Sequence, residues 1–174
     1  FKTGTTSSGT SGLISLSTGS ATVGKGGQIL MSVGAGTTTS GGDMSLTAGE
    51  TTANTQIAGS VSITGGAGSS STAGQGGHLK WTGGAGTGGT GGSISLASGA
   101  GTATSTGSIR LKTVDSGSNG VSGHLSFSTG DATSGSSGRL LMSTGSATNG
   151  VSGFITLSAG LGTDIGGEVS AIGG

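Results

Sequence analysis

The chain has 174 residues, of which 44 are Gly, 32 are Ser and 28 are Thr, and it contains no Pro and no Cys. Six basic and six acidic residues give a formal net charge of zero, so there is no basic stripe for a nucleic acid or an anionic membrane. No apolar run reaches the length needed to insert across a bilayer, and disulfides are excluded.

One short motif recurs along the whole chain at intervals close to 15 residues. It consists of a glycine, one residue of any type, an apolar residue, another residue of any type and usually a second apolar residue. A fixed short period indicates a repeat architecture, in which neighbouring units cover each other's apolar side. We call the glycines that open the motif the anchor glycines: Gly12, Gly27, Gly42, Gly59, Gly77, Gly92, Gly107, Gly123, Gly138, Gly153 and Gly167.

Each anchor glycine opens a predicted β-strand, as in segments 12–19, 42–49, 92–99 and 153–160. Apolar residues two positions apart follow the period of a strand with one buried face. The second apolar position of each repeat is therefore predicted to lie in a core. The core residues are Leu16, Leu46, Ile63, Trp81, Leu96, Leu111, Phe127, Met142 and Leu157.

A second glycine follows three residues after the second apolar position in nearly every repeat. Glycine repeated at one phase favours a corner with positive φ, and we expect distorted geometry at residues 114–115, where Val114 replaces it. In the two longest repeats we expect the extra residues to bulge at a turn, around 53–55 and 69–71. These corner glycines are Gly4, Gly19, Gly34, Gly49, Gly66, Gly84, Gly99, Gly130, Gly145 and Gly160.

A short second strand is predicted after each corner, with a small residue facing inward and Thr facing outward. The predicted fold is all-β: a single continuous β-solenoid over residues 1–174, of the parallel β-helix or β-roll type. It has about 11 coils of ~15 residues and a thin, flattened cross-section. The outward column comprises Thr22, Thr37, Thr52, Thr87, Thr102, Thr133, Thr148 and Thr163.

Three interpretations of the Thr column stay open. The hydroxyls form a purely structural ladder between strands, they carry O-linked sugars, or they bind ice. Flat Thr arrays resemble those of the insect β-solenoid antifreeze proteins. This chain departs from their pattern, because those proteins have paired Thr-x-Thr motifs and disulfides, whereas here the partner column is mixed and Cys is absent.

No arrangement of residues indicates catalysis, a metal site or a cofactor. His78 and His124 share a phase but lie three repeats apart, and neither has the orienting partner that a catalytic base needs. The acidic residues do not recur at the spacing of calcium-binding nonapeptide repeats. We therefore expect no enzymatic activity, no catalytic or metal-binding residues and no cofactor.

A string close to SGxIxLSTGxATxGxSG, with one or two substitutions in each copy, lies at 11–27, 122–138 and 137–153. It resembles Gly/Ser/Thr-rich tandem repeats of secreted or surface proteins from algae, other protists and some microbes. The resemblance implies an extracellular or cell-surface structural role. Because both ends of the array fall inside a repeat, we expect it to be uncapped. The hypothesis is a solenoid stalk or filament subunit that self-associates into a homopolymer or belongs to a longer array. The alternatives are an ice-binding solenoid and a phage or bacterial surface fibre or adhesin.

Overall fold

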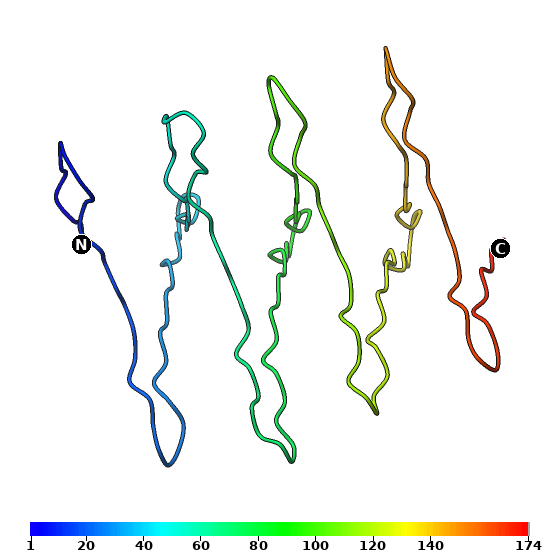
Figure 1. The fold of residues 1–174 in the computed structure, drawn as a ribbon, viewed down its shortest axis with the longest axis horizontal. Helices are drawn as coiled ribbons and strands as arrows, with labels where there is room; N and C mark the ends of the chain where they lie inside the picture. The colour runs from blue at the N-terminus through cyan, green and yellow to red at the C-terminus, as the bar shows by residue number, and fades with distance from the viewer. Residues whose placement is uncertain (174) are drawn as a thin grey trace. The chain divides into compact units, whose positions relative to one another are not determined.

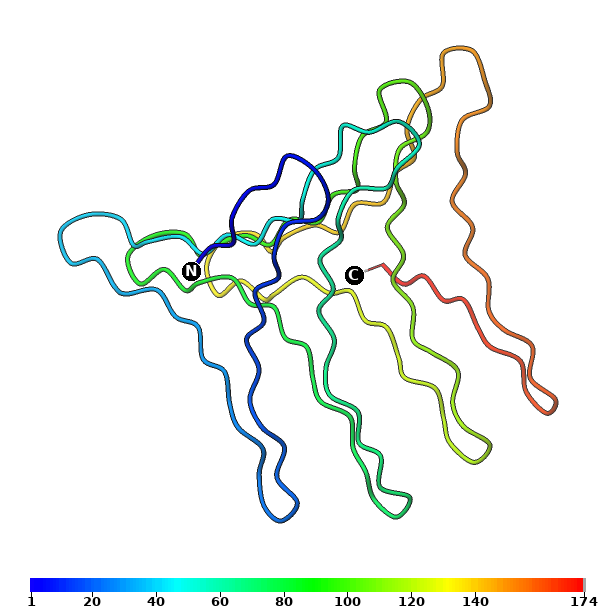
Figure 2. The same cartoon turned by 60° about the vertical axis from the view of Figure 1, so that its left-hand side comes forward.

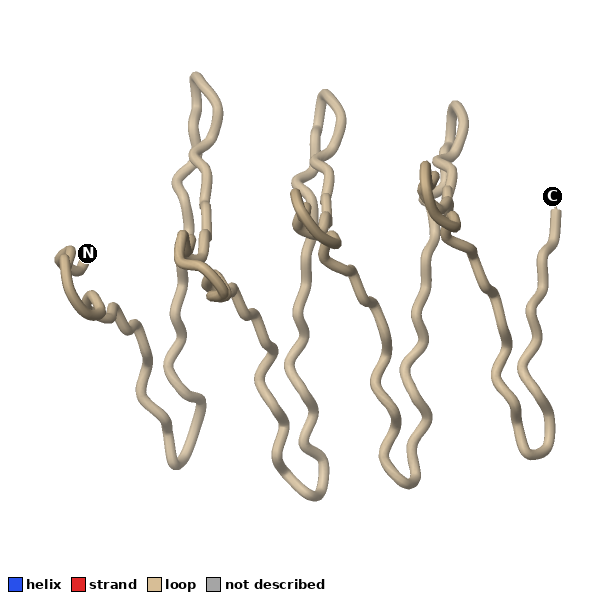
Figure 3. Tube along the Cα trace, turned by 45° about the horizontal axis from the view of Figure 1, so that its top comes forward, coloured by secondary structure: helices blue, strands red, loops and turns tan. Residues whose placement is uncertain are grey.

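The computed structural model describes residues 1–173, and these contain no α-helix and no β-strand (Figure 3). The predicted β-solenoid is therefore wrong, since stacked coils require ladders of hydrogen-bonded strands. The described residues form only eight backbone–backbone hydrogen bonds, whereas a folded globular protein has roughly one hydrogen bond per residue. Alternating apolar residues are present, but in residues 1–173 they do not form the strands that the alternation predicts.

The 15-residue repeat persists in the structure as a series of chain reversals. Within each part of the trace, extended segments are joined by narrow hairpin loops (Figure 1). The prediction that the extra residues of the long repeats lie at turns is confirmed at 53–55 and, slightly further along the chain, at 71–73. The bends and turns are 7–9, 22–24, 37–39, 53–55, 71–73, 87–89, 102–104, 118–119, 133–135, 148–150 and 163–165.

Each loop runs from a corner position to the next anchor glycine, and its two ends meet in what we call the neck. In six necks the N–H of the anchor glycine donates a hydrogen bond to the carbonyl of the corner glycine. The N···O distances are 2.8–2.9 Å in five necks and 3.5 Å in the sixth. The bonded pairs are Gly27 to Gly19, Gly59 to Gly49, Gly77 to Gly66, Gly92 to Gly84, Gly107 to Gly99 and Gly167 to Gly160.

The neck explains why the anchor position is occupied by glycine. A Cβ at Gly27 would lie 2.7 Å from Cβ of Thr18, and a Cβ at Gly42 would lie 2.7 Å from Cγ1 of Val33. At all eleven anchor glycines, the atoms nearest to such a Cβ belong to the corner residue or to the residue before it. At eight of them the nearest atom would lie 2.7–3.2 Å away, so a side chain would push against the opposite side of the neck, whereas at Gly107, Gly123 and Gly138 the distance of 3.4–3.5 Å is an ordinary contact.

The segments between necks have a constant length, and we call them arms. From the anchor glycine to the corner position the chain always advances seven residues, whereas the loops advance between seven and eleven. The neck hydrogen bond nevertheless measures 2.8 Å in loop 66–77 and 2.9 Å in loop 160–167. All length variation is thus confined to the loops. The arms are 12–19, 27–34, 42–49, 59–66, 77–84, 92–99, 107–114, 123–130, 138–145 and 153–160.

The prediction of positive φ at the corner glycines is wrong. Among the described residues, positive φ occurs at Gly9, Gly24, Gly135 and Thr55, all within bends. Because the corner backbone stays in the ordinary region, Val114 also fits there without positive φ, and no distortion of the expected kind is found. The loop tips, not the corners, carry the left-handed conformations that favour glycine.

Some loops reverse by close backbone approach rather than by positive φ. In loop 34–42, a Cβ at Gly36 would lie 2.7 Å from the carbonyl oxygen of Ser40 across the loop. The same close approach occurs at Gly86, 2.6 Å from the Thr90 carbonyl oxygen. Glycine two residues after the corner therefore permits a tighter tip than Ala would.

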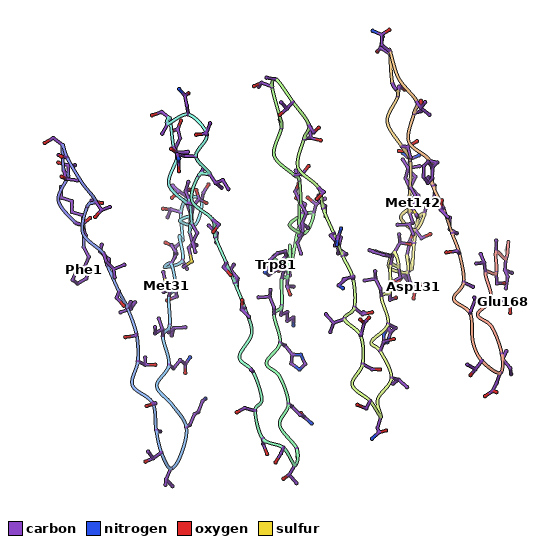
Figure 4. The ribbon with its side chains drawn as sticks, viewed as in Figure 1. Phe1, Met31, Trp81, Asp131, Met142 and Glu168 are labelled. Atoms are coloured by element: carbon purple, nitrogen blue, oxygen red, sulfur yellow. The ribbon has the colours of Figure 1, made fainter. Side chains whose placement is uncertain are left out.

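The described residues include no buried side chain, so the predicted core is wrong for this chain. Their accessible surface is 17,000 Å², against about 7,300 Å² expected for a compact protein of this mass. Trp81, labelled in Figure 4, is 57% exposed. The nine predicted core residues, Leu16, Leu46, Ile63, Trp81, Leu96, Leu111, Phe127, Met142 and Leu157, are 54–71% exposed.

The chain divides into two units, Phe1–Ile94 and Ser95–Gly174. The boundary falls inside arm 92–99, between the two members of its apolar pair, Ile94 and Leu96. Both units are built from the same local pattern of arms and narrow loops (Figure 2).

Candidate functional site

The first candidate site is the pair of apolar side chains on each arm. The pair occupies the second and fourth positions after the anchor glycine, and its large side chains are 46–71% exposed. Each arm therefore presents a short apolar surface that is about half exposed. The pairs are Ile14 and Leu16, Ile29 and Met31, Met44 and Leu46, Val61 and Ile63, Leu79 and Trp81, Ile94 and Leu96, Ile109 and Leu111, Leu125 and Phe127, Leu140 and Met142, and Ile155 and Leu157.

Charges are divided unequally between arms and loops. Four of the six basic residues lie on arms, and four of the six acidic residues lie in loops. Five arms, among them 59–66 and 153–160, carry no charged or His residue at all. The arm residues are Lys80, Arg110, Lys112 and Arg139, and the loop residues are Glu50, Asp115, Asp131 and Asp164.

The second candidate site is the Thr column, which the structure places at the loop tips. Thr52 lies directly before the turn at 53–55, and the other seven predicted Thr residues each begin a bend. All are exposed, and they lie on separate loops instead of forming one ladder. We call the seven the tip threonines: Thr22, Thr37, Thr87, Thr102, Thr133, Thr148 and Thr163.

A different set of Thr residues has a structural role that the sequence analysis missed. The hydroxyl of Thr18 donates to the carbonyl of Gly27, and that of Thr144 donates to the carbonyl of Gly153, both at 3.1 Å. At Gly27 this bond accompanies a long backbone bond of 3.5 Å to Gly19, and at Gly153 it joins the two sides of a neck for which no backbone bond is found in residues 1–173. The sequence pattern that could have indicated this role is a Thr directly before a corner glycine and nine residues before an anchor glycine.

No arrangement for catalysis or metal binding is found in residues 1–173. This part of the chain has no pocket and no group of three or more His, Asp or Glu side chains able to hold a metal ion. His78 and His124 lie on separate arms, 77–84 and 123–130. Nor does the described region include a helix of the length and apolar character needed to cross a membrane.

The repeating geometry therefore offers two kinds of chemistry: apolar burial along the arms and exposed hydroxyl groups at the loop tips. No known protein family, curated protein or solved structure matches this chain.

Proposed function

We propose that the chain is a structural protein of extracellular or cell-surface material, and that it assembles with further copies of itself through its arms. The observation that carries this proposal is the exposed apolar pair repeated on arms of constant length. Burial of apolar surface is the main force in protein association, and residues 1–173 bury none of their large apolar side chains.

The surface available for assembly is large. The chain exposes about 9,700 Å² more than a compact protein of the same mass would. A standard protein interface buries about 800 Å² on each partner. Extended arms also leave backbone N–H and C=O groups that a neighbouring chain can satisfy, as an added strand does at a sheet edge.

A second copy of the same chain is the partner that the pattern fits best. Equal arm lengths let the apolar pairs of two copies face each other, arm after arm. Zero net charge removes long-range repulsion between copies. The composition and the resemblance to secreted repeat proteins support a location outside the cell or at its surface.

The ice-binding interpretation loses its physical basis, because it required Thr at strand spacing along one flat sheet. In the described residues the tip threonines lie on separate loops, without strands to hold them in register. The resemblance to antifreeze proteins rested on that ladder.

Sedimentation velocity over a range of concentrations, together with negative-stain electron microscopy, tests the proposal. We expect the mass to grow with concentration and elongated or fibrous particles to form. A single species with the monomer mass up to the solubility limit would refute self-assembly.

A further inference from the structure

The tip threonines combine exposure with a free hydroxyl group, and from this we propose that they are acceptor sites for O-linked sugars. The proposal rests on the extracellular location in the proposed function, because sugar transfer of this kind takes place on the secretory route or at the cell surface. It assigns a covalent modification to residues that the arms do not need for assembly.

The hydroxyl groups of the tip threonines form no hydrogen bond within the described residues. The hydroxyls of Thr18 and Thr144, in contrast, donate to the necks of their loops. Two repeats therefore contain both kinds of Thr four residues apart, with Thr22 and Thr148 at the tips. A transferase would have to break a hydrogen bond at the neck and none at the tip.

The position at a bend also favours modification. Exposed loop tips are the segments that enzymes acting on proteins most readily engage, because they can enter an active site without unfolding the rest of the molecule. Tracts rich in Ser and Thr in extracellular proteins are commonly O-glycosylated. In this chain, the position at a bend would distinguish the tip threonines from the many other Ser and Thr residues.

The necks separate the tips from the arms. The neck hydrogen bond has nearly the same length in loops of seven, eight and eleven residues, as loops 160–167, 84–92 and 66–77 show. In these three loops the size of the loop therefore does not alter the backbone bond that closes the neck. A bulky sugar at the tip can likewise be carried without displacing the apolar pairs.

The transfer step is chemically balanced and involves no oxidation or reduction. The co-substrate is a nucleoside diphosphate sugar. Oγ1 of a tip Thr forms a bond to the anomeric carbon, and the bond from that carbon to the diphosphate oxygen breaks. The nucleoside diphosphate leaves with the bonding electron pair, and the hydroxyl proton passes to a base of the transferase.

The full chain secreted from a eukaryotic cell line that performs O-glycosylation provides the test. Electron-transfer fragmentation mass spectrometry is expected to locate sugars on the tip threonines and not on Thr18 or Thr144. Thr148→Ala is expected to remove the sugar from loop 145–153, whereas Thr144→Ala and Thr148→Ser are expected to retain it.

Unmodified tips, phosphate in place of sugar, or equal modification of neck and tip hydroxyls would overturn the proposal. Assembly of the same material is measured separately by sedimentation. Assembly without sugar would refute only the modification, and sugar without assembly would refute only the proposed structural function.

Discussion

Replacing the apolar pair of one arm with acidic residues tests whether the arms hold copies together. Arm 153–160 suits this test, because it carries no charge and its pair, Ile155 and Leu157, is 47% and 66% exposed. Full burial of such a side chain contributes about 1.5–3 kcal/mol. Burying the exposed share of both side chains against another copy then contributes about 2–3 kcal/mol to the free energy of association. The double variant Ile155→Asp/Leu157→Asp loses this contribution.

At 1.4 kcal/mol per factor of ten, this loss weakens association by about 30- to 150-fold, and burial of the new carboxylates weakens it further. The concentration at which light scattering begins to rise measures the effect. The matched control is Ala147→Asp/Asn149→Asp, which adds the same charge at the same spacing in the preceding loop and is expected to change that concentration by less than about threefold. Equal shifts in the two variants, or no shift in the arm variant, would refute the reasoning.

Three further outcomes are expected. Inserting Gly-Ser at the tip of loop 145–153 should leave assembly unchanged, since lengthening such a loop costs only about 0.2 kcal/mol; the same insertion in the middle of arm 153–160 should abolish the match between apolar pairs, and light scattering distinguishes the two. Gly36→Ala should shift the amide NMR signals of its loop because the new Cβ would lie 2.7 Å from the Ser40 carbonyl oxygen, whereas Gly34→Ala, with nothing within 4 Å, should not. In calorimetry, dilute protein should show no cooperative heat absorption because it has no core, and assembled protein should show a concentration-dependent peak; a peak that is independent of concentration would contradict the structure.

The turn at 53–55 was predicted correctly from the sequence, and the turn predicted around 69–71 lies at 71–73. The apolar pairs keep their alternation but lack the predicted burial. Anchor glycines and corner residues recur because they form the necks, and this contact depends on backbone spacing that a repeat preserves. The extra residues of the long repeats were expected at turns, since only there can residues be added without shifting the apolar pairs. The turn at 53–55 bears this out.

The β-solenoid was predicted wrongly because the alternation of apolar and polar residues specifies one apolar face of a segment but not what covers that face. Ile94 and Leu96 alternate as they would in a buried strand, yet they remain 52% and 54% exposed. The same pattern is expected of a segment that pairs with another chain. The role of Thr18 was missed for a related reason: a residue at a neck acts on a carbonyl nine residues away, and neither residue type identifies that pairing.

The constancy of the arms and the variability of the loops together argue that order in this chain depends on its partners. If the loops were the binding elements, their lengths would have to be matched between repeats, yet they vary from seven to eleven residues while the arms do not vary. If the chain packed against itself, its apolar pairs would be covered, and they are not. Arms of constant length that remain exposed within their own chain can bury their apolar pairs only against a surface with the same regular spacing. Another copy of this chain is such a surface, and it leaves the loops with their tip threonines outside the contact.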